Sequence, residues 1–298
     1  MSWEADKVMY RDVSYDAAYQ GDTLLWRKPN VTNYFKIEWM SNGTIGFNFT
    51  GKNTEYRLNG GNWETVGNIV ISASTGDIVE LRGTENSYGS GIGINDGTAD
   101  FKAYGNIMSL LYGDDHIDKY TLKADNSFYG FFYNCFDLKD ASNLLLPATS
   151  LTRYCYAHMF EGTGLQDIGM PSLPATQLND FCYSNMFSFC DSLLGTKKLP
   201  ATTLSTGCYS QMFFSCVNLV SAPVLPAPTL VNGCYGNMFE QCSRLDWVKC
   251  LATDISANNA TSNWLYGVSQ TGTFYKDANR TWPSGSSGIP NGWTVIDA

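Results

Sequence analysis

The chain has 298 residues, of which 44% are apolar and 14% aromatic, and its formal net charge is −9 at pH 7. This length and apolar content suffice for two hydrophobic cores, whereas the negative charge argues against nucleic-acid binding, which requires a basic surface. The sequence has no apolar run of about 18 residues, so we expect no membrane insertion.

Residues 1–29 are expected to form a separate N-terminal segment. Short apolar runs at 8–10 and 24–26 indicate one or two strands. The first residues have neither the basic nor the apolar region of a signal peptide, which predicts a protein made without secretion. A chain from which a signal had been removed would look the same.

Residues 30–105 show the period of two that is typical of β-strands. The pair Asn42-Gly43 separates two alternating apolar runs, Phe35–Trp39 and 45–49, and this arrangement predicts a hairpin. Further short runs bounded by Gly or Asn predict two more hairpins (56–58 with Trp63, and 69–73 with 78–81) and later strands at 92–94 and 101–103. Short strands at this spacing predict an antiparallel β-sandwich.

One pattern occurs four times between residues 146 and 251: L-P-A-T, a spacer, C-Y-x-x-M-F and C-x-x-L. Its Cys-Tyr pairs begin at Cys155, Cys182, Cys208 and Cys234, so they recur after 27, 26 and 26 residues. A fixed period of this size is typical of a solenoid. Degenerate copies at 127–138 and 251–268 bring the number of units to about six, with the outer two as caps.

Each repeat is interpreted as a strand, a turn, an α-helix and a segment that returns to the next strand. In the third copy Leu204, Cys208, Met212 and Cys216 are spaced by four, which predicts one apolar face of a helix capped by Thr206. The proline-bounded segment 219–225 predicts a short strand. Packed helices need about 8–10 Å and paired strands about 4.8 Å. The stack is therefore expected to bend into a right-handed, horseshoe-like arc with the strands inside.

With these motifs, residues 127–298 resemble the BspA-like leucine-rich repeats, which occur in surface proteins of gut anaerobes and in structural proteins of their phages. The ending Gly288-Ile289-Pro290-Asn291-Gly292-Trp293 also carries the resemblance. The first copy departs from the pattern, with Thr163 in the second Cys position and Leu165 one place early, and the fourth reads L-P-A-P-T.

The resemblance implies a mixed fold, an N-terminal antiparallel β-sandwich followed by a C-terminal α/β leucine-rich-repeat solenoid. The expected domains are the attachment segment 1–29, the β-sandwich 30–105, the solenoid 106–270 and a C-terminal cap 271–298.

The nine cysteines all fall between Cys135 and Cys250. On one helix Cys208 and Cys216 would lie about 12 Å apart, and equivalent cysteines on neighbouring helices about 8–10 Å apart, beyond the reach of a disulfide. The sequence has no C-x-x-C pair and only two histidines. We therefore expect buried free thiols and no zinc.

The sequence carries no enzyme signature, and we expect no cofactor, no metal and no catalytic residue. The pair Asp114-Asp115 beside His116 could supply a base or a metal ligand, although a solvated linker is the commoner explanation. His158 lies within a repeat and is expected to be partly exposed.

The candidate ligand-binding residues lie on the expected inner sheet. If the repeated Leu points into the core, the residue three places later does so too, Ile168 after Leu165 for example, and the residues two and four places later face outward. These columns bring Trp247, Lys249 and Tyr275 together at one end and place Lys197 and Asp167 farther along. An exposed Trp beside a Tyr can stack on a sugar or anchor a protein. The alternative is that both rings cover the C-terminal cap.

The resemblance, together with the missing signal peptide, favours a non-enzymatic bacteriophage virion protein of the tail or fibre type. The N-terminal region would bind other virion proteins, and the repeats would bind a host surface glycan or protein. The alternative is a BspA-like adhesin on the bacterial cell surface. A polysaccharide-degrading enzyme has only the acidic pair Asp114-Asp115 and the acidic end of the inner sheet in its favour.

Overall fold

The computed structural model describes residues 9–10, 13–14, 17–20, 23–27 and 33–298 and divides the chain into two compact units, 1–33 and 34–298. In the first unit β1 (Met9–Tyr10) pairs with β2 (Val13–Ser14), and β3 (Ala17–Gln20) pairs with β4 (Thr23–Arg27), both antiparallel. The strand expected at 24–26 lies in β4. Most of the expected attachment segment lies outside the described residues.

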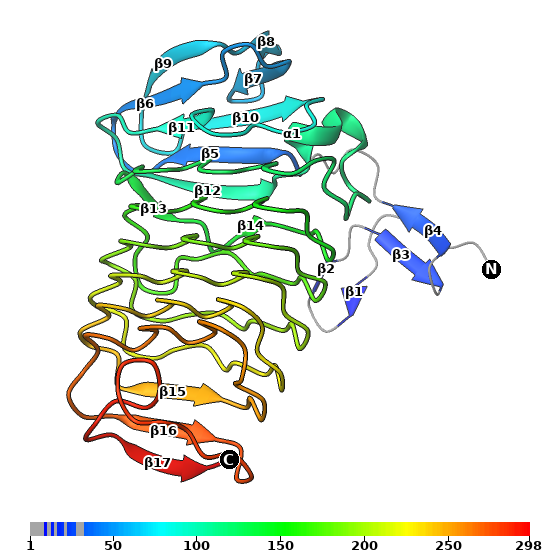
Figure 1. Cartoon of the computed structure of the whole chain (residues 1–298). Helices are drawn as coiled ribbons and strands as arrows, with labels where there is room; N and C mark the ends of the chain where they lie inside the picture. The colour runs from blue at the N-terminus through cyan, green and yellow to red at the C-terminus, as the bar shows by residue number, and fades with distance from the viewer. Residues whose placement is uncertain (1–8, 11–12, 15–16, 21–22, 28–32) are drawn as a thin grey trace. The chain divides into compact units, whose positions relative to one another are not determined.

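The second unit begins with an antiparallel β-sheet region made of two sheets (Figure 1). The larger sheet has the order β13-β12-β5-β10-β7-β8, with β14 also paired to β12, and the smaller has the order β11-β6-β9. The strands are β5 (Phe35–Trp39), β6 (Gly43–Asn48), β7 (Thr54–Leu58), β8 (Glu64–Thr65), β9 (Asn68–Ala73), β10 (Ile78–Gly83), β11 (Gly93–Asn95), β12 (Phe101–Asn106), β13 (Leu138–Asp140) and β14 (Leu144–Leu145).

Alternation along these strands builds a core between the sheets. Phe35 and Ile37 of β5 are fully buried, and Trp39 packs against Phe47 of β6 with ring centres 6.4 Å apart. The intervening residues of β5 are half-buried and face away from this core. The period of two in the sequence therefore identifies the buried face correctly.

Two of the three expected hairpins are wrong in their pairing, although their strands exist. β5 pairs with β10 and β12 rather than β6, and β9 pairs with β6 rather than β10, so only β7 and β8 form an expected hairpin. At Asn42-Gly43 the chain passes from one sheet to the other. Gly43 has φ +149°, and a Cβ there would lie 2.7 Å from the Thr98 hydroxyl, so this crossing requires glycine.

Beyond β12 the chain forms six stacked coils (Figure 1). β13 pairs in parallel with β12, and isolated parallel bridges such as Ser221–Trp247 continue the strand column through the stack. The column ends in a parallel sheet of β15 (Trp247–Cys250), β16 (Thr273–Lys276) and β17 (Thr294–Asp297). The sheet region and the coils share one hydrophobic core.

The α-helices expected in the repeats are wrong. Residues 127–268, all of them described, contain strands and turns but no helix; α1 (Ser109–Tyr112) and the 3₁₀ turn η1 (Gly113–Asp115) precede them. Each supposed helix is a chain of overlapping β-turns, here called a turn spiral. The six turn spirals span residues 126–135, 154–163, 181–190, 207–216, 233–242 and 259–268.

Hydrogen bonds within and between coils define the turn spiral. In the spiral 207–216 the N–H of Met212 donates to the carbonyl three residues earlier, whereas the N–H of Gln211 donates to Gly236 of the next coil. These two kinds of bond alternate along the segment. Gly207, Gln211 and Ser215 have φ near +60°, so a left-handed residue recurs every four positions. Thr206 therefore caps no helix, and its carbonyl instead accepts the N–H of Phe181.

Ladders of stacked rings fill the interior of the coils. In one ladder Tyr156, Tyr183, Tyr209 and Tyr235 lie with ring centres 5.7–6.0 Å apart, and Phe160, Phe187, Phe213 and Phe239 form a second ladder at 5.4–5.7 Å. This spacing is close to that of paired strands rather than of packed helices. The reason for expecting a horseshoe-like arc is therefore absent.

The L-P-A-T segments form the third side of each coil. Their Leu and Ala side chains are buried, as in Leu173 and Ala175, and the following residue bridges to the next coil, as in Gln177–Thr203. Proline fits this side because each coil makes only isolated bridges there rather than a continuous ladder of N–H donors.

Candidate functional site

The sheet formed by β15 and β16 positions the aromatic residues predicted from the sequence. Val248 and Cys250 point into the core and are fully buried, so Trp247 and Lys249 face outward and are half-buried. The parallel register places Lys249 opposite Tyr275.

The structure brings Trp247, Lys249 and Tyr275 together as one cluster, here called the aromatic cluster. The ring centres of Trp247 and Tyr275 lie 5.7 Å apart at an interplanar angle of 43°, and the Lys249 Nζ lies 6.0 Å from the Tyr275 ring centre. Two adjacent rings with a cation beside them provide stacking area and a hydrogen-bond donor.

The aromatic cluster does not form the interior of the C-terminal cap. That interior contains Trp264, Trp282 and Phe274, which are buried and in ring contact with one another. Trp247 and Tyr275 lie on the opposite face of the strands. This arrangement argues against the alternative that they only cover the cap.

Lys197 and Asp167 lie apart from the aromatic cluster. The Lys197 Nζ donates to the Ser142 carbonyl at 2.9 Å, toward the first coil, and burial lowers the pKa of Lys197. Asp167 is exposed, and its carbonyl accepts the N–H of Leu194 at 2.8 Å. Both residues are on the strand side of the stack, but they belong to earlier coils.

The expectation that Ile168 points into the core is wrong. Its side chain is 52% exposed, whereas Met170 is fully buried. Leu165 comes one residue early in its repeat, which shifts the strand register and turns Ile168 outward.

The outward face of the coils continues into the larger sheet. Lys102 of β12 lies opposite Asp140 of β13 and forms an ion pair of 2.9 Å with Glu38 of β5. Tyr104 lies on the same face with Lys102 5.8 Å from its ring centre, and burial, with the bond to Glu38, raises the pKa of Tyr104 to about 12. One continuous face, charged at one end and aromatic at the other, therefore runs along the second unit.

The acidic pair at the junction is engaged in structural contacts. Asp114 accepts hydrogen bonds from the Tyr34 hydroxyl at 2.7 Å and from Arg82 at 2.9 Å, and these bonds hold its pKa below the usual range. The His116 ring is buried and contacts the Gly113 carbonyl at 2.7 Å. Within the described residues, no three His, Cys, Asp or Glu side chains gather in a way that could hold a metal ion.

All nine cysteines are free and buried. The sequence argument from helix spacing is wrong in its premise, because neighbouring coils lie closer together than helices do. Burial raises the thiol pKa values, to about 12 for Cys155 and Cys190, so the thiols stay protonated at neutral pH.

The cysteines of the repeats form two columns, which differ in their hydrogen bonds. The first column consists of Cys155, Cys182, Cys208 and Cys234, and the second of Cys135, Cys190, Cys216 and Cys242. In the second column Cys216 donates to the Phe187 carbonyl at 3.0 Å, and Thr163, which replaces a cysteine there, donates to Phe160 at 2.8 Å. In the first column Cys182 lies 4.0 Å from the carbonyl of Cys208. Only the second column provides a good acceptor for a polar hydrogen.

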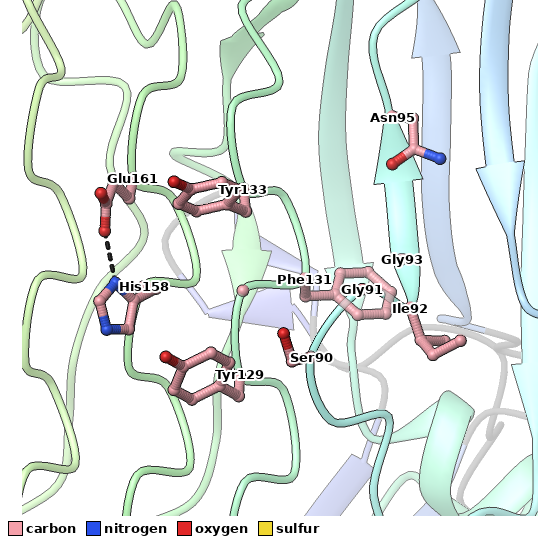
Figure 2. Close-up of a pocket in the computed structure, with 11 residues that line it drawn as sticks. Ser90, Gly91, Ile92, Gly93, Asn95, Tyr129, Phe131, Tyr133, His158 and Glu161 are labelled. Atoms are coloured by element: carbon pink, nitrogen blue, oxygen red, sulfur yellow. Dashed lines mark hydrogen bonds and ion pairs between the residues drawn. The ribbon is translucent and has the colours of Figure 1, made fainter.

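Sequence reasoning missed a cavity of about 320 Å³ beside the first two turn spirals, lined by Tyr129, Tyr133, His158 and Glu161 (Figure 2). Its walls come from segments far apart in the sequence, so no local motif reveals it. The one available signal is His158, since the same position of later repeats carries Asn or Gln.

Comparisons of this chain with protein-family models, with curated proteins and with solved structures found no match. None of the helices in the part of the chain that the structure describes has the length and apolar character needed to span a membrane.

Proposed function

We propose that this chain is a non-enzymatic bacteriophage virion protein of the tail or fibre type that presents its stacked repeats for host recognition. The proposal rests on the resemblance of the repeat motifs to BspA-like leucine-rich repeats. The chain would be a member in which turn spirals replace the helices. The separate unit of residues 1–33 would bind other virion proteins.

The observation that carries the recognition role is the aromatic cluster on a rigid sheet. Trp247 and Tyr275 expose ring area to solvent, and Lys249 supplies a donor beside them. Their strands are fixed by hydrogen bonds on both sides, so little conformational entropy is lost on binding. A host surface glycan or protein would contact this end of the outward strand face, and many copies on one particle would strengthen individually weak contacts.

Attachment of the purified protein to host cells tests this role. Trp247→Ala should lower the affinity about tenfold, or about 1.4 kcal/mol, and should leave the melting temperature nearly unchanged. Tyr266→Ala is the matched control, because Tyr266 is an exposed aromatic residue on a turn spiral. Equal attachment by wild type and Trp247→Ala would place the binding site elsewhere.

Peptide mapping of purified phage particles tests the location. Particles without peptides of this chain would favour the alternative, a BspA-like adhesin on the bacterial cell surface.

A further inference from the structure

A cavity of about 320 Å³ lies where the smaller sheet meets the first two turn spirals (Figure 2). One wall is the segment around β11, with Ser90, Ile92 and Asn95. The other wall comes from the spirals, with Tyr129 and Tyr133 in the first and the pair His158–Glu161 in the second. This volume is at the lower end for small-molecule sites, about 300–1,000 Å³, and suits a single ring-sized group.

The floor of the cavity is rigid. The N–H of Ile94 donates to the Phe131 carbonyl at 3.0 Å, and the Asn48 side chain holds the Gly91 carbonyl at 2.7 Å. A Cβ at Gly93 would come within 2.0 Å of the Phe131 carbonyl oxygen, so glycine permits the close approach of the two walls. Bonds of this kind keep the site formed without a ligand, which limits the entropy lost on binding.

The side chains combine aromatic surface with hydrogen-bonding groups. Tyr133 is 50% exposed, and the Tyr129 ring contacts the His158 ring with centres 4.9 Å apart and an interplanar angle of 45°. The carboxylate of Glu161 is bonded to the His158 ring, and its side chain is only 14% exposed. Burial and Glu161 raise the pKa of Tyr129, so its hydroxyl remains a neutral donor.

Neither Lys nor Arg lines the cavity, whereas Glu161 does. An anionic ligand would therefore meet the Glu161 carboxylate with no Lys or Arg to offset the repulsion between the two negative charges. The geometry points to a binding site for one neutral sugar residue. Its apolar face would pack on Tyr133, and its hydroxyls would bond to Glu161 and Asn95.

Departures from the repeat pattern coincide with the cavity. The position of His158 carries Asn185, Gln211, Asn237 and Asn263 in later coils. In the fifth coil the equivalent pair is Asn237–Glu240, which also bonds within its turn, whereas Ser188, Phe214 and Tyr266 occupy the Glu161 position of the other later coils. An amide side chain at this position is therefore enough to form the turn. The imidazole of His158 adds a ring that contacts Tyr129 at the cavity.

This site lies on β11 and the turn spirals, whereas the aromatic cluster lies on β15 and β16. The inference is thus independent of the proposed host-recognition role, and a failed cell-attachment assay would not affect it.

Ligand-observed saturation-transfer NMR on the full chain tests the site. The probes are the methyl glycosides of glucose, galactose and N-acetylglucosamine at millimolar concentration, with glucuronate as the acidic comparison. At least one neutral glycoside should receive saturation, and glucuronate should bind at least tenfold more weakly. Tyr133→Ala should weaken binding of the neutral glycoside about tenfold.

Tyr266→Ala provides the matched control. Tyr266 occupies the same position of its turn spiral as Tyr133 and is 52% exposed, but it does not line the cavity. Binding should be unchanged in this variant. The inference is overturned if no neutral glycoside binds, if glucuronate binds best, or if Tyr266→Ala weakens binding as much as Tyr133→Ala.

Discussion

Replacing Gln211 by Gly should leave the protein more stable than replacing it by Ala. Gln211 has φ +56° in the fourth turn spiral, a left-handed conformation. A side chain with Cβ raises the energy of this conformation by about 1–2 kcal/mol. Glycine escapes this strain but loses about 0.5–1 kcal/mol more in chain entropy on folding. The net advantage of Gly over Ala is therefore between about 0 and 1.5 kcal/mol, with a centre at about 0.8 kcal/mol.

If this segment were an α-helix, the Ala variant would be more stable than the Gly variant. Within a helix Ala is more stable than Gly by about 1 kcal/mol. The two structures therefore differ by about 2 kcal/mol in the Gly–Ala comparison at a single residue. This difference exceeds the error of a denaturation experiment performed on paired variants.

Urea denaturation under reducing conditions, followed by far-UV circular dichroism, measures the comparison. Ser210 is the control, since it neighbours Gln211 but is not left-handed, and Ala should be the more stable of its two variants. Both substitutions there remove the same bond from the Ser210 hydroxyl to Gly236. If Ala is also the better residue at Gln211, the turn spiral is wrong and the segment is helical.

Four further predictions concern the buried Cys and Tyr side chains of the coils. Cys208→Ser should destabilise the fold by about 1–3 kcal/mol. Cys216→Ser should destabilise it by less than about 1 kcal/mol, because a hydroxyl at this position can donate a hydrogen bond as Thr163 does. Equal losses of stability in urea denaturation would contradict this difference. Tyr209→Phe should stabilise by about 1 kcal/mol, since the Tyr209 hydroxyl is buried without a partner, and a lower melting temperature would count against it. Nine thiols should react with a thiol reagent only after denaturation. Because the folded pKa of Cys155 is about 12 and its ordinary value is 9.0, the folded state holds more protons between these values. The contribution of this thiol to the free energy of unfolding should therefore be fully present below about pH 9 and be lost as the pH rises toward 12.

The strands of the sheet region could be predicted from the sequence, but their partners could not. Alternation at Phe35, Ile37 and Trp39 depends only on which face is buried, and that face is the same whichever strand lies beside it. The Asn42-Gly43 pair is a strong hairpin signal, yet here glycine serves a crossing between sheets. Tertiary packing decides between the two uses.

The helix prediction failed because a period of four resembles a period of 3.6 over a short segment. Each four-residue step in an α-helix turns the face by about 40°, so the drift from Cys208 to Cys216 still fits one apolar face. The missed signal is the residue at every fourth position. Gly207, Gly233, Asn237 and Asn263 tolerate the left-handed conformation, and they recur where a helix would favour Ala or Leu.

The aromatic cluster was accessible from the sequence because counting from the repeated Leu gives the register in the last coils. The same count fails at Ile168, where Leu165 shifts the strand by one residue. The cavity was not accessible, since Ser90 and His158 approach each other only through the packing of the sheet against the coils.

The coil-to-coil contacts have a consequence for how the length of such a protein can change. Each turn spiral bonds to the next through backbone groups and through rings stacked on like rings, as in Phe187 on Phe213. Duplicating one 26-residue unit would repeat these contacts without creating new ones and would lengthen the stack by about 5 Å. The distance from the sheet region to the Trp247 surface could thus be tuned in small, equal increments during evolution. In the proposed host-recognition role, the aromatic cluster could then follow a receptor of changing height while its own residues stayed the same.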